Sequence, residues 1–197
     1  MPVLAIADAS VVGNLSSLSS ADADAVRRAV RYLYDLGHRQ IARVGGPESL
    51  AHSYIRDSAF ADVASELGMR YRCLHTDYTP ETGREATKRL LAFSEHPTAI
   101  IYDNDVMALA GLGVAASQGI KVPEEISIMS WDDSLMCTAA YPNLTAMGRD
   151  VVDTGKQAAG LLLKLIGGER VGHLMEGPYE LRARASTVPL RQRNKMR

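Results

Sequence analysis

The sequence predicts an α/β protein in which a mainly parallel sheet is flanked by helices. Short apolar runs alternate with longer amphipathic segments along most of the 197 residues, and this alternation is typical of βαβ units. Strand-like runs also lead directly into acids, since residues 98–102 precede Asp103 and residues 126–130 precede Trp131 and Asp132. Ligands of open α/β sheets bind beyond the carboxyl ends of the strands, so these acids predict one shared pocket.

The first half of the chain indicates two long helices among three strands. A short apolar run at residues 3–7 predicts the first strand. Segments 26–33 and 60–67 place apolar residues at helical spacing, and each is followed by a glycine that ends the helix. Residues 41–44 and 73–76 predict the other two strands.

Three further helices are indicated in the second half. Thr79-Pro80-Glu81 supplies a capping hydroxyl, a proline at the first helical position and an acid in the first turn. Residues 107–117 and 152–166 predict the other two helices, each followed closely by glycine. The residues expected to face the core late in the helix after Thr79 are Leu90, Leu91 and Phe93.

Two segments interrupt the alternation. Residues 13–20 (GNLSSLSS) are loop-like, and residues 145–150 separate the strand–helix repeats from the last helix. We interpret both as crossovers between two lobes. The basic tail at residues 191–197 contains few apolar residues and is predicted to be disordered.

Composition narrows the class of protein. The formal net charge of −1 gives no electrostatic reason for the whole chain to bind nucleic acid. No apolar run reaches the length of a membrane span, and the N-terminus has no secretory pattern. Cys73 and Cys137 stand far apart and outside any metal-binding motif, which predicts free thiols and a cytoplasmic protein. We expect no cofactor and no metal.

Several short motifs occur in a characteristic order along the chain. They are LGHRQIA at 36–42, GP at 46–47, DNDVMAL at 103–109, VPEEISI at 122–128, DD at 132–133 and RAST at 184–187. This ordered set resembles the sensor region of the lactose/galactose-repressor family of bacterial transcriptional regulators. Each motif is weak alone, and their order and spacing carry the resemblance.

The resemblance implies a periplasmic-binding-protein-like fold, truncated at its N-terminal side, with one near-complete lobe and part of a second. Residues 21–147 and 180–190 are expected to form the C-terminal lobe, and residues 1–20 and 148–179 a remnant of the N-terminal lobe. It also implies a homodimer that binds a sugar or related polar effector between the lobes. Effector binding would change operator affinity through a DNA-binding headpiece that these residues do not include.

Seven residues are candidates for contact with the effector. Arg56 stands at the family's ligand-arginine position, and its alternative role is a salt bridge with Asp57 or Glu66. Asp132 suits paired hydroxyl groups, although a helix cap would use the same acid. We assign ligand contact to Asp132 and a structural role to Asp133. The full set is Asp8, His52, Arg56, Tyr78, Asn104, Asp132 and Arg149.

The remaining candidates also have structural alternatives. Tyr78 stands where the family stacks an aromatic ring on its ligand, and the alternative is a half-buried core tyrosine. Asn104 serves ligand contact or helix capping equally well. His52 is a further hydrogen-bonding group or a solvated loop residue. Asp8 aligns with a family pocket acid or forms a turn, and Arg149 indicates an acidic or phosphorylated effector or a solvent-facing hinge charge.

Two rival functions start from the same residues. Asp103, Asp105, Asp132 and Asp133 suggest a magnesium-dependent phosphatase-like enzyme. The sequence has no phosphate-cradling glycine loop and no nucleophile turn, so we expect no catalysis. A free-standing sugar-binding protein of periplasmic type shares the expected architecture but requires export.

Overall fold

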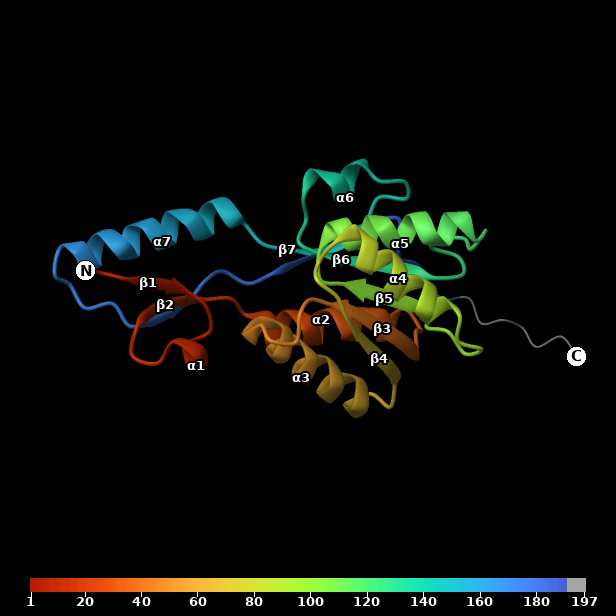
Figure 1. The fold of residues 1–197 in the computed structure, drawn as a ribbon, viewed down its shortest axis with the longest axis horizontal. Helices are drawn as coiled ribbons and strands as arrows, with labels where there is room; N and C mark the ends of the chain where they lie inside the picture. Colours follow the sequence, from red (N-terminus) through yellow and green to blue (C-terminus); the bar gives the residue numbers. More distant parts are fainter. Residues whose placement is uncertain (191–197) are drawn as a thin grey trace, which may run out of the picture.

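The computed structural model describes residues 1–190, which form two sheets of different size. The six-stranded sheet has the order β4-β3-β5-β6-β7-β9, and the three-stranded sheet has the order β1-β2-β8. Figure 1 shows the two sheets at opposite ends of an elongated molecule. The tail at residues 191–197, predicted to be disordered, lies outside the described residues.

The larger sheet is parallel except for its last strand. Its strands are β3 (Gln40–Gly45), β4 (Arg70–His75), β5 (Ala99–Tyr102), β6 (Ser127–Trp131), β7 (Thr145–Gly148) and β9 (Glu180–Arg182). Only β9 among them is antiparallel, pairing with β7. Helices α2 (Asp22–Asp35) and α3 (Ala51–Glu66) cover one face, and α4 (Pro80–Leu91) and α5 (Asp105–Ser117) cover the other. The α/β class and the mainly parallel sheet are therefore confirmed.

Local sequence signals explain how these helices begin and end. Gly37 follows α2 with a φ of 93°, a conformation that glycine adopts without strain. The Thr79 hydroxyl accepts a hydrogen bond from the backbone N–H of Thr82 at the start of α4. Leu90 is fully buried, but Phe93 lies beyond the helix and is 39% exposed beneath the Arg72 guanidinium. The expectation that Phe93 faces the core was wrong.

The smaller sheet contains a strand that the sequence did not predict. It consists of β1 (Leu4–Ile6), β2 (Ser16–Ser19) and β8 (His173–Met175), with α1 (Ala9–Val12) and α7 (Val151–Ile166) beside it. Residues 13–20 were expected to form a loop, yet β2 pairs in parallel with both β1 and β8. Serine hydroxyls in β2 bond to neighbouring carbonyls and to the His173 ring, so a serine-rich strand is buried without unsatisfied hydroxyls.

Three segments run between the sheets, after β2, after β7 and after β8. Residues 145–148, expected to be part of a crossover, instead form β7, so only the following residues cross. Hydrogen bonds tie these segments together. The backbone N–H of Glu176 donates to the Ser19 carbonyl over 2.9 Å, and its carboxylate binds Arg149 and the Thr154 hydroxyl. We call these three connected segments, at residues 20–21, 149–150 and 176–179, the hinge region.

The last long helix, α7, presents much of its apolar side to solvent. Val152, Leu163 and Ile166 are all well exposed, and Thr154 is the only residue of the helix that is buried. No helix within residues 1–190 has both the length and the apolar character needed to cross a bilayer. Cys73 and Cys137 are free thiols, as expected.

Candidate functional site

A cavity of about 420 Å³ lies between the two sheets, at the carboxyl ends of the strands. Its volume falls within the range of roughly 300–1,000 Å³ that is typical of small-molecule sites. The smaller sheet and its neighbouring turns contribute Ile6, Ala7, Asp8, Leu18 and Ser20. The rest of the lining comes from α2 and α3, from the loops that follow strands of the larger sheet, and from the hinge region. Both parts of the molecule therefore form one site.

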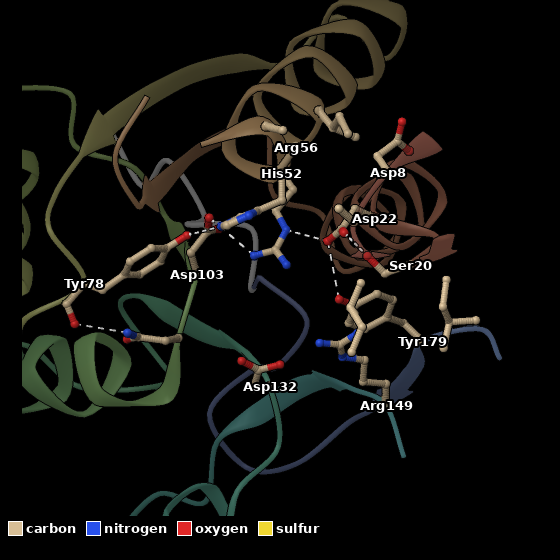
Figure 2. A pocket seen from close by; sticks show the side chains of 16 residues that line it. Asp8, Ser20, Asp22, His52, Arg56, Tyr78, Asp103, Asp132, Arg149 and Tyr179 are labelled. Carbon is tan, nitrogen blue, oxygen red and sulfur yellow. Dashed lines mark hydrogen bonds and ion pairs between the residues drawn. The ribbon is translucent and has the colours of Figure 1, made fainter. Parts of the chain in front are cut away.

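All seven candidate residues line this cavity, although they come from distant parts of the sequence. They are Asp8, His52, Arg56, Tyr78, Asn104, Asp132 and Arg149. Figure 2 shows Arg56 and Asp132 facing the same space. Each lies at or just after the carboxyl end of a strand or within the first turns of a helix. The parallel topology therefore brings them together.

Arg56 lies on α3 and is almost fully buried beside two carboxylates. Its Nε donates to Asp22 over 2.6 Å, and its Nη1 lies 3.5 Å from an oxygen of Asp103. The guanidinium also packs over the Trp131 ring, 4.6 Å from its centroid. Burial alone lowers the pKa of Arg56, but Asp103 and Asp22 raise it above its usual value. Neither alternative partner, Asp57 or Glu66, forms a salt bridge with Arg56; Asp22 and Asp103 do so instead.

A second arginine stands behind this pair, inside the larger sheet. Arg43 on β3 is 1% exposed and binds both carboxylate oxygens of Asp103. It also forms an ion pair with Asp57 of α3. Asp22, Arg56, Asp103, Arg43 and Asp57 thus form a continuous arginine–aspartate network that fixes the Arg56 guanidinium at the cavity wall.

The two neighbouring acids after β6 have different surroundings. Asp132 has a φ of 64°, and its carboxylate faces the cavity with no hydrogen bond or ion pair to residues 1–190. Desolvation raises the pKa of Asp132, while Arg56 and Arg149 act in the opposite direction. Asp133 instead pairs with Arg182 and Arg184. Of this pair, only Asp132 offers free carboxylate oxygens to the cavity.

The cap of the following helix is supplied by a third residue. Helix α6 (Leu135–Ala139) begins at Ser134, whose hydroxyl accepts from the backbone N–H of Met136. Asp132 is therefore not committed to capping.

Tyr78 and His52 form a polar and aromatic wall on one side of the cavity. The His52 Nε2 lies 2.7 Å from the Tyr78 hydroxyl, and the two rings are stacked with centroids 6.2 Å apart. Burial lowers the pKa of His52, so its ring is neutral near pH 7. Tyr78 has a φ of 69°, and its ring lies against Gly46, where any Cβ would collide with it. The glycine therefore makes room for the aromatic wall.

Asn104 caps a helix, which is one of the two roles considered for it, and it also lines the cavity. Its Oδ1 accepts from the backbone N–H of Met107 over 2.8 Å and caps α5. Its Nδ2 donates to the carbonyl of Tyr78 over 3.1 Å. Asn104 thus lines the cavity and also holds Tyr78 in place.

Asp8 and Arg149 complete the lining from the smaller sheet and the hinge region. Asp8 accepts from the backbone N–H of Ser10 over 2.9 Å and caps α1. Side-chain and backbone hydrogen bonds from Ser10 lower the pKa of Asp8. Arg149 pairs with Glu176 and is only partly exposed. It is therefore not the solvent-facing hinge charge that was considered.

Sequence reasoning missed Asp22 and Tyr179, which also line the cavity. Asp22 is the first residue of α2, shortly after β2 ends. Ligands bind beyond the carboxyl ends of the strands in such sheets, so a correct prediction of β2 would have pointed to Asp22. Tyr179 lies in an irregular hinge segment, and its hydroxyl is 3.4 Å from Asp22. No local pattern marks Tyr179.

The acids of the magnesium hypothesis do not converge on one point. Asp103 is bound by Arg43 and Arg56, and Asp133 is bound by Arg182 and Arg184. Within the described part of the chain, no cluster of three or more acid, histidine or cysteine side chains has the geometry to hold a metal ion. Asp103 and Asp133 hold arginine side chains in place.

Comparison with known proteins agrees with this architecture. Residues 30–187 match the family described as periplasmic binding protein-like domain. The HTH-type transcriptional repressor CytR of Escherichia coli (strain K12) is 32% identical over 167 residues, covering 82% of this chain and 49% of that protein. The chain thus spans about half the length of the curated relatives it matches.

Two solved structures extend the likeness to three dimensions. A LacI family transcriptional regulator from Bifidobacterium animalis subsp. lactis is 59% identical, with a TM-score of 0.94, over 96% of this chain and 70% of the other. The transcriptional regulator CelR in complex with cellobiose is 27% identical, with a TM-score of 0.82, over 88% of this chain and 54% of the other. The chain belongs to the periplasmic binding protein-like family, in the form found in the effector-binding domains of LacI-family transcriptional regulators.

Proposed function

We propose that this chain is the effector-sensing part of a DNA-binding transcriptional regulator and binds a sugar or a related polar metabolite. The observation that carries the proposal is the cavity between the two sheets, lined by Arg56, Asp132 and Tyr78. Because one ligand touches both sheets, its binding favours one relative arrangement of them, which is the basis of a sensor.

The lining suits a ligand rich in hydroxyl groups. A hydroxyl both donates and accepts hydrogen bonds, so it can donate to the free carboxylate of Asp132 and accept from Arg56. The rings of Tyr78 and His52 offer a flat face for the C–H side of a sugar. CelR, a solved relative, is described in complex with cellobiose, which supports a carbohydrate as the first class to test.

We propose that the hinge region divides the molecule into two lobes. The C-terminal lobe comprises residues 21–147 and 180–190, and residues 1–20 and 148–179 belong to the N-terminal lobe. In the whole regulator, effector binding would change operator affinity through a DNA-binding headpiece, in the cytoplasm. Regulation, and not catalysis, is the proposed activity because the matched relatives are transcriptional regulators.

The test is a thermal-shift screen of neutral sugars, polyols and nucleosides, followed by calorimetric titration of each stabilising compound. A ligand that binds only the folded state raises the melting temperature. The variant Arg56→Ala removes a charged hydrogen bond worth about 1.5–3 kcal/mol, so affinity should fall roughly tenfold to a hundredfold. Asp132→Asn should weaken binding in the same way.

The control is Arg70→Ala, because Arg70 is exposed and pairs with Glu95 away from the cavity. It should bind the stabilising compound as the wild type does. If Arg56→Ala and Asp132→Asn also bind like the wild type, the cavity is not the effector site.

We further propose that the chain pairs as a homodimer through the surface around α6. Leu135 and Tyr141 are 82% and 98% exposed. Met136 lines a neighbouring groove with Val106 and Leu109 of α5. Exposed apolar side chains beside an apolar groove favour a protein partner. Light scattering should give a dimer mass for the wild type and a monomer mass for Leu135→Glu; a monomeric wild type at tens of micromolar would refute the pairing.

A further inference from the structure

We infer that the cavity excludes phosphorylated and other anionic compounds, and that the effector is an uncharged polyhydroxyl molecule or one bearing an amine. This inference rests on the proposed sensing function and narrows the chemical class of its ligand. It follows from how the charged groups in and behind the cavity wall are paired with one another.

Both arginines that line the cavity are already committed to carboxylates. Arg56 is held between Asp22 and Asp103, and Arg149 is paired with Glu176, which is almost fully buried. The sequence suggested an acidic or phosphorylated effector from Arg149, but the positive charge of its guanidinium is already balanced by Glu176. Each guanidinium keeps N–H groups that its carboxylate partners do not use, among them the buried Arg149 Nε. A phosphate bound through these groups would still lie beside the carboxylates that already balance the arginine charge, and this apposition of like charges is unfavourable.

The cavity wall also carries more negative than positive charge. Four aspartates line it, namely Asp8, Asp22, Asp103 and Asp132, against the two arginines Arg56 and Arg149, so four minus two leaves a formal charge of −2. The groups directly behind the wall do not reverse this balance. Arg43 contributes one positive charge, and Asp57 and Glu176 contribute two negative charges.

Two possible sources of positive charge are too weak to reverse the net negative charge of the cavity wall. The first turn of α3 faces the cavity through Ala51 and His52, and a helix N-terminus contributes about half a positive charge. His52 adds none near neutral pH, because burial lowers its pKa. The field in the cavity therefore repels anions and attracts cations.

The free hydrogen-bonding capacity fits the same class of ligand. The Asp132 carboxylate has no partner among the described residues and can only accept hydrogen bonds while it is ionised. A hydroxyl or ammonium group donates to it, whereas a phosphate or carboxylate oxygen would face it with like charge. Arg56 retains N–H groups beyond those used by its two aspartates, and these can donate to a neutral oxygen.

The experiment compares matched compounds with and without a charge. Thermal shift at constant ionic strength is measured for two matched pairs, glucose with glucose 6-phosphate and ribose with ribose 5-phosphate. Glucosamine and inorganic phosphate are measured in the same way. The wild type, Asp132→Asn and Arg56→Ala are measured in parallel. We expect no phosphate compound to stabilise the wild type through the cavity. A sugar that binds should do so on the order of a hundredfold more tightly than its phosphate, since apposed like charges cost several kcal/mol.

Asp132→Asn removes one negative charge from the open side of the cavity without a change of shape. The substitution should reduce the difference in affinity between each sugar and its phosphate, or permit weak phosphate binding. A stabilising effect of phosphate that persists in Arg56→Ala is measured again in Arg149→Ala, because both arginines line the cavity. An effect that survives each substitution arises outside the cavity and agrees with the inference, and one lost in Arg149→Ala would overturn it. A phosphate compound that stabilises the wild type, and loses this effect in Arg56→Ala, would overturn it.

The two proposals fail in different ways. Cavity-dependent binding of a sugar phosphate would refute anion exclusion and leave the sensing function intact. A neutral sugar whose stabilising effect is unchanged in both variants would count against the cavity as a sensor. The absence of cavity-dependent phosphate binding supports exclusion whichever neutral compound is recognised.

Discussion

Arg43 and Asp103 form a two-bond ion pair inside the larger sheet, with Arg43 Nε 2.9 Å from Asp103 Oδ1 and Arg43 Nη2 donating to Asp103 Oδ2. Both side chains are excluded from solvent. Asp103 also faces Arg56, so the pair supports a guanidinium at the cavity wall. A charge network of this kind is stable only while every member keeps its partner.

Arg43→Met should therefore destabilise the protein strongly. The substitution leaves Asp103 buried with only the more distant Arg56, and removal of one partner of a buried pair costs about 3–5 kcal/mol. Urea unfolding followed by circular dichroism measures the change in the free energy of unfolding. Arg70→Met is the control, since its exposed pair with Glu95 should contribute less than about 1 kcal/mol. Equal losses in the two variants would show that the network is not stabilising.

Gly46→Ala should weaken effector binding more than it weakens the fold. The new methyl group would occupy the space of the Tyr78 ring and push it away from His52. Loss of an aromatic contact of about 1 kcal/mol corresponds to roughly a fivefold to tenfold loss of affinity. Titration of a stabilising ligand into the wild type and the variant measures this loss. An unaltered dissociation constant would mean that Tyr78 does not contact the effector.

Two glycines in neighbouring helices should respond oppositely to alanine. At Gly113 on the exposed side of α5 a Cβ meets open space, so Gly113→Ala should stabilise the protein by about 0.5–1 kcal/mol. At Gly83 in α4 a Cβ would lie 3.0 Å from Met107, so Gly83→Ala should lose this gain or destabilise the protein. Chemical denaturation of both variants tests the close contact of α4 with α5. Equal stabilisation would show that the helices are not tightly packed there.

His38 should make stability fall in mild acid. Its ring is buried between the hydroxyls of Thr98 and Ser127, and burial lowers its pKa from 6.5 to about 4. Between these values the unfolded chain binds a proton that the folded chain does not. The free energy of unfolding should then fall as pH decreases through this window, by at most about 1.4 kcal/mol per pH unit. Above pH 6.5 this contribution is complete and constant.

The measurement is urea unfolding of the wild type and His38→Gln at pH 7.5, 6 and 5. The variant should be less stable at pH 7.5 and should show a shallower loss toward pH 5. Parallel slopes for the two proteins would contradict the role given to His38.

Strands β3 to β6 of the larger sheet could be predicted from sequence because their signals are local, whereas β7 was expected to be part of a crossover and β9 was not predicted. Apolar strands such as residues 98–102, capped starts such as Thr79, and glycine at helix ends such as Gly37 each specify a short segment. β2 could not be found in this way because its serines read as a loop. Its strand character depends on pairing with β1 and β8, which are distant in the sequence.

The residues gathered at the cavity were predictable for a related reason. Parallel strands bring their carboxyl ends to one edge, so residues such as Asn104 and Asp132 meet there whatever their separation in sequence. Their bonding partners were not predictable. Arg43 lies in the middle of an apolar strand, and only the fold shows that it faces Asp103 and Asp57.

Several residues that line the cavity belong to the hinge region or contact it. Asp22 contacts Tyr179 as well as Arg56, and Arg149 joins Glu176 while it lines the cavity. A biosensor engineer who alters Asp22 or Arg149 to accept a new inducer would also change how the two sheets are connected, and with it the dynamic range of the switch. Tyr78 and Asp132 have no such connection, so a library confined to them should alter specificity and leave the response intact.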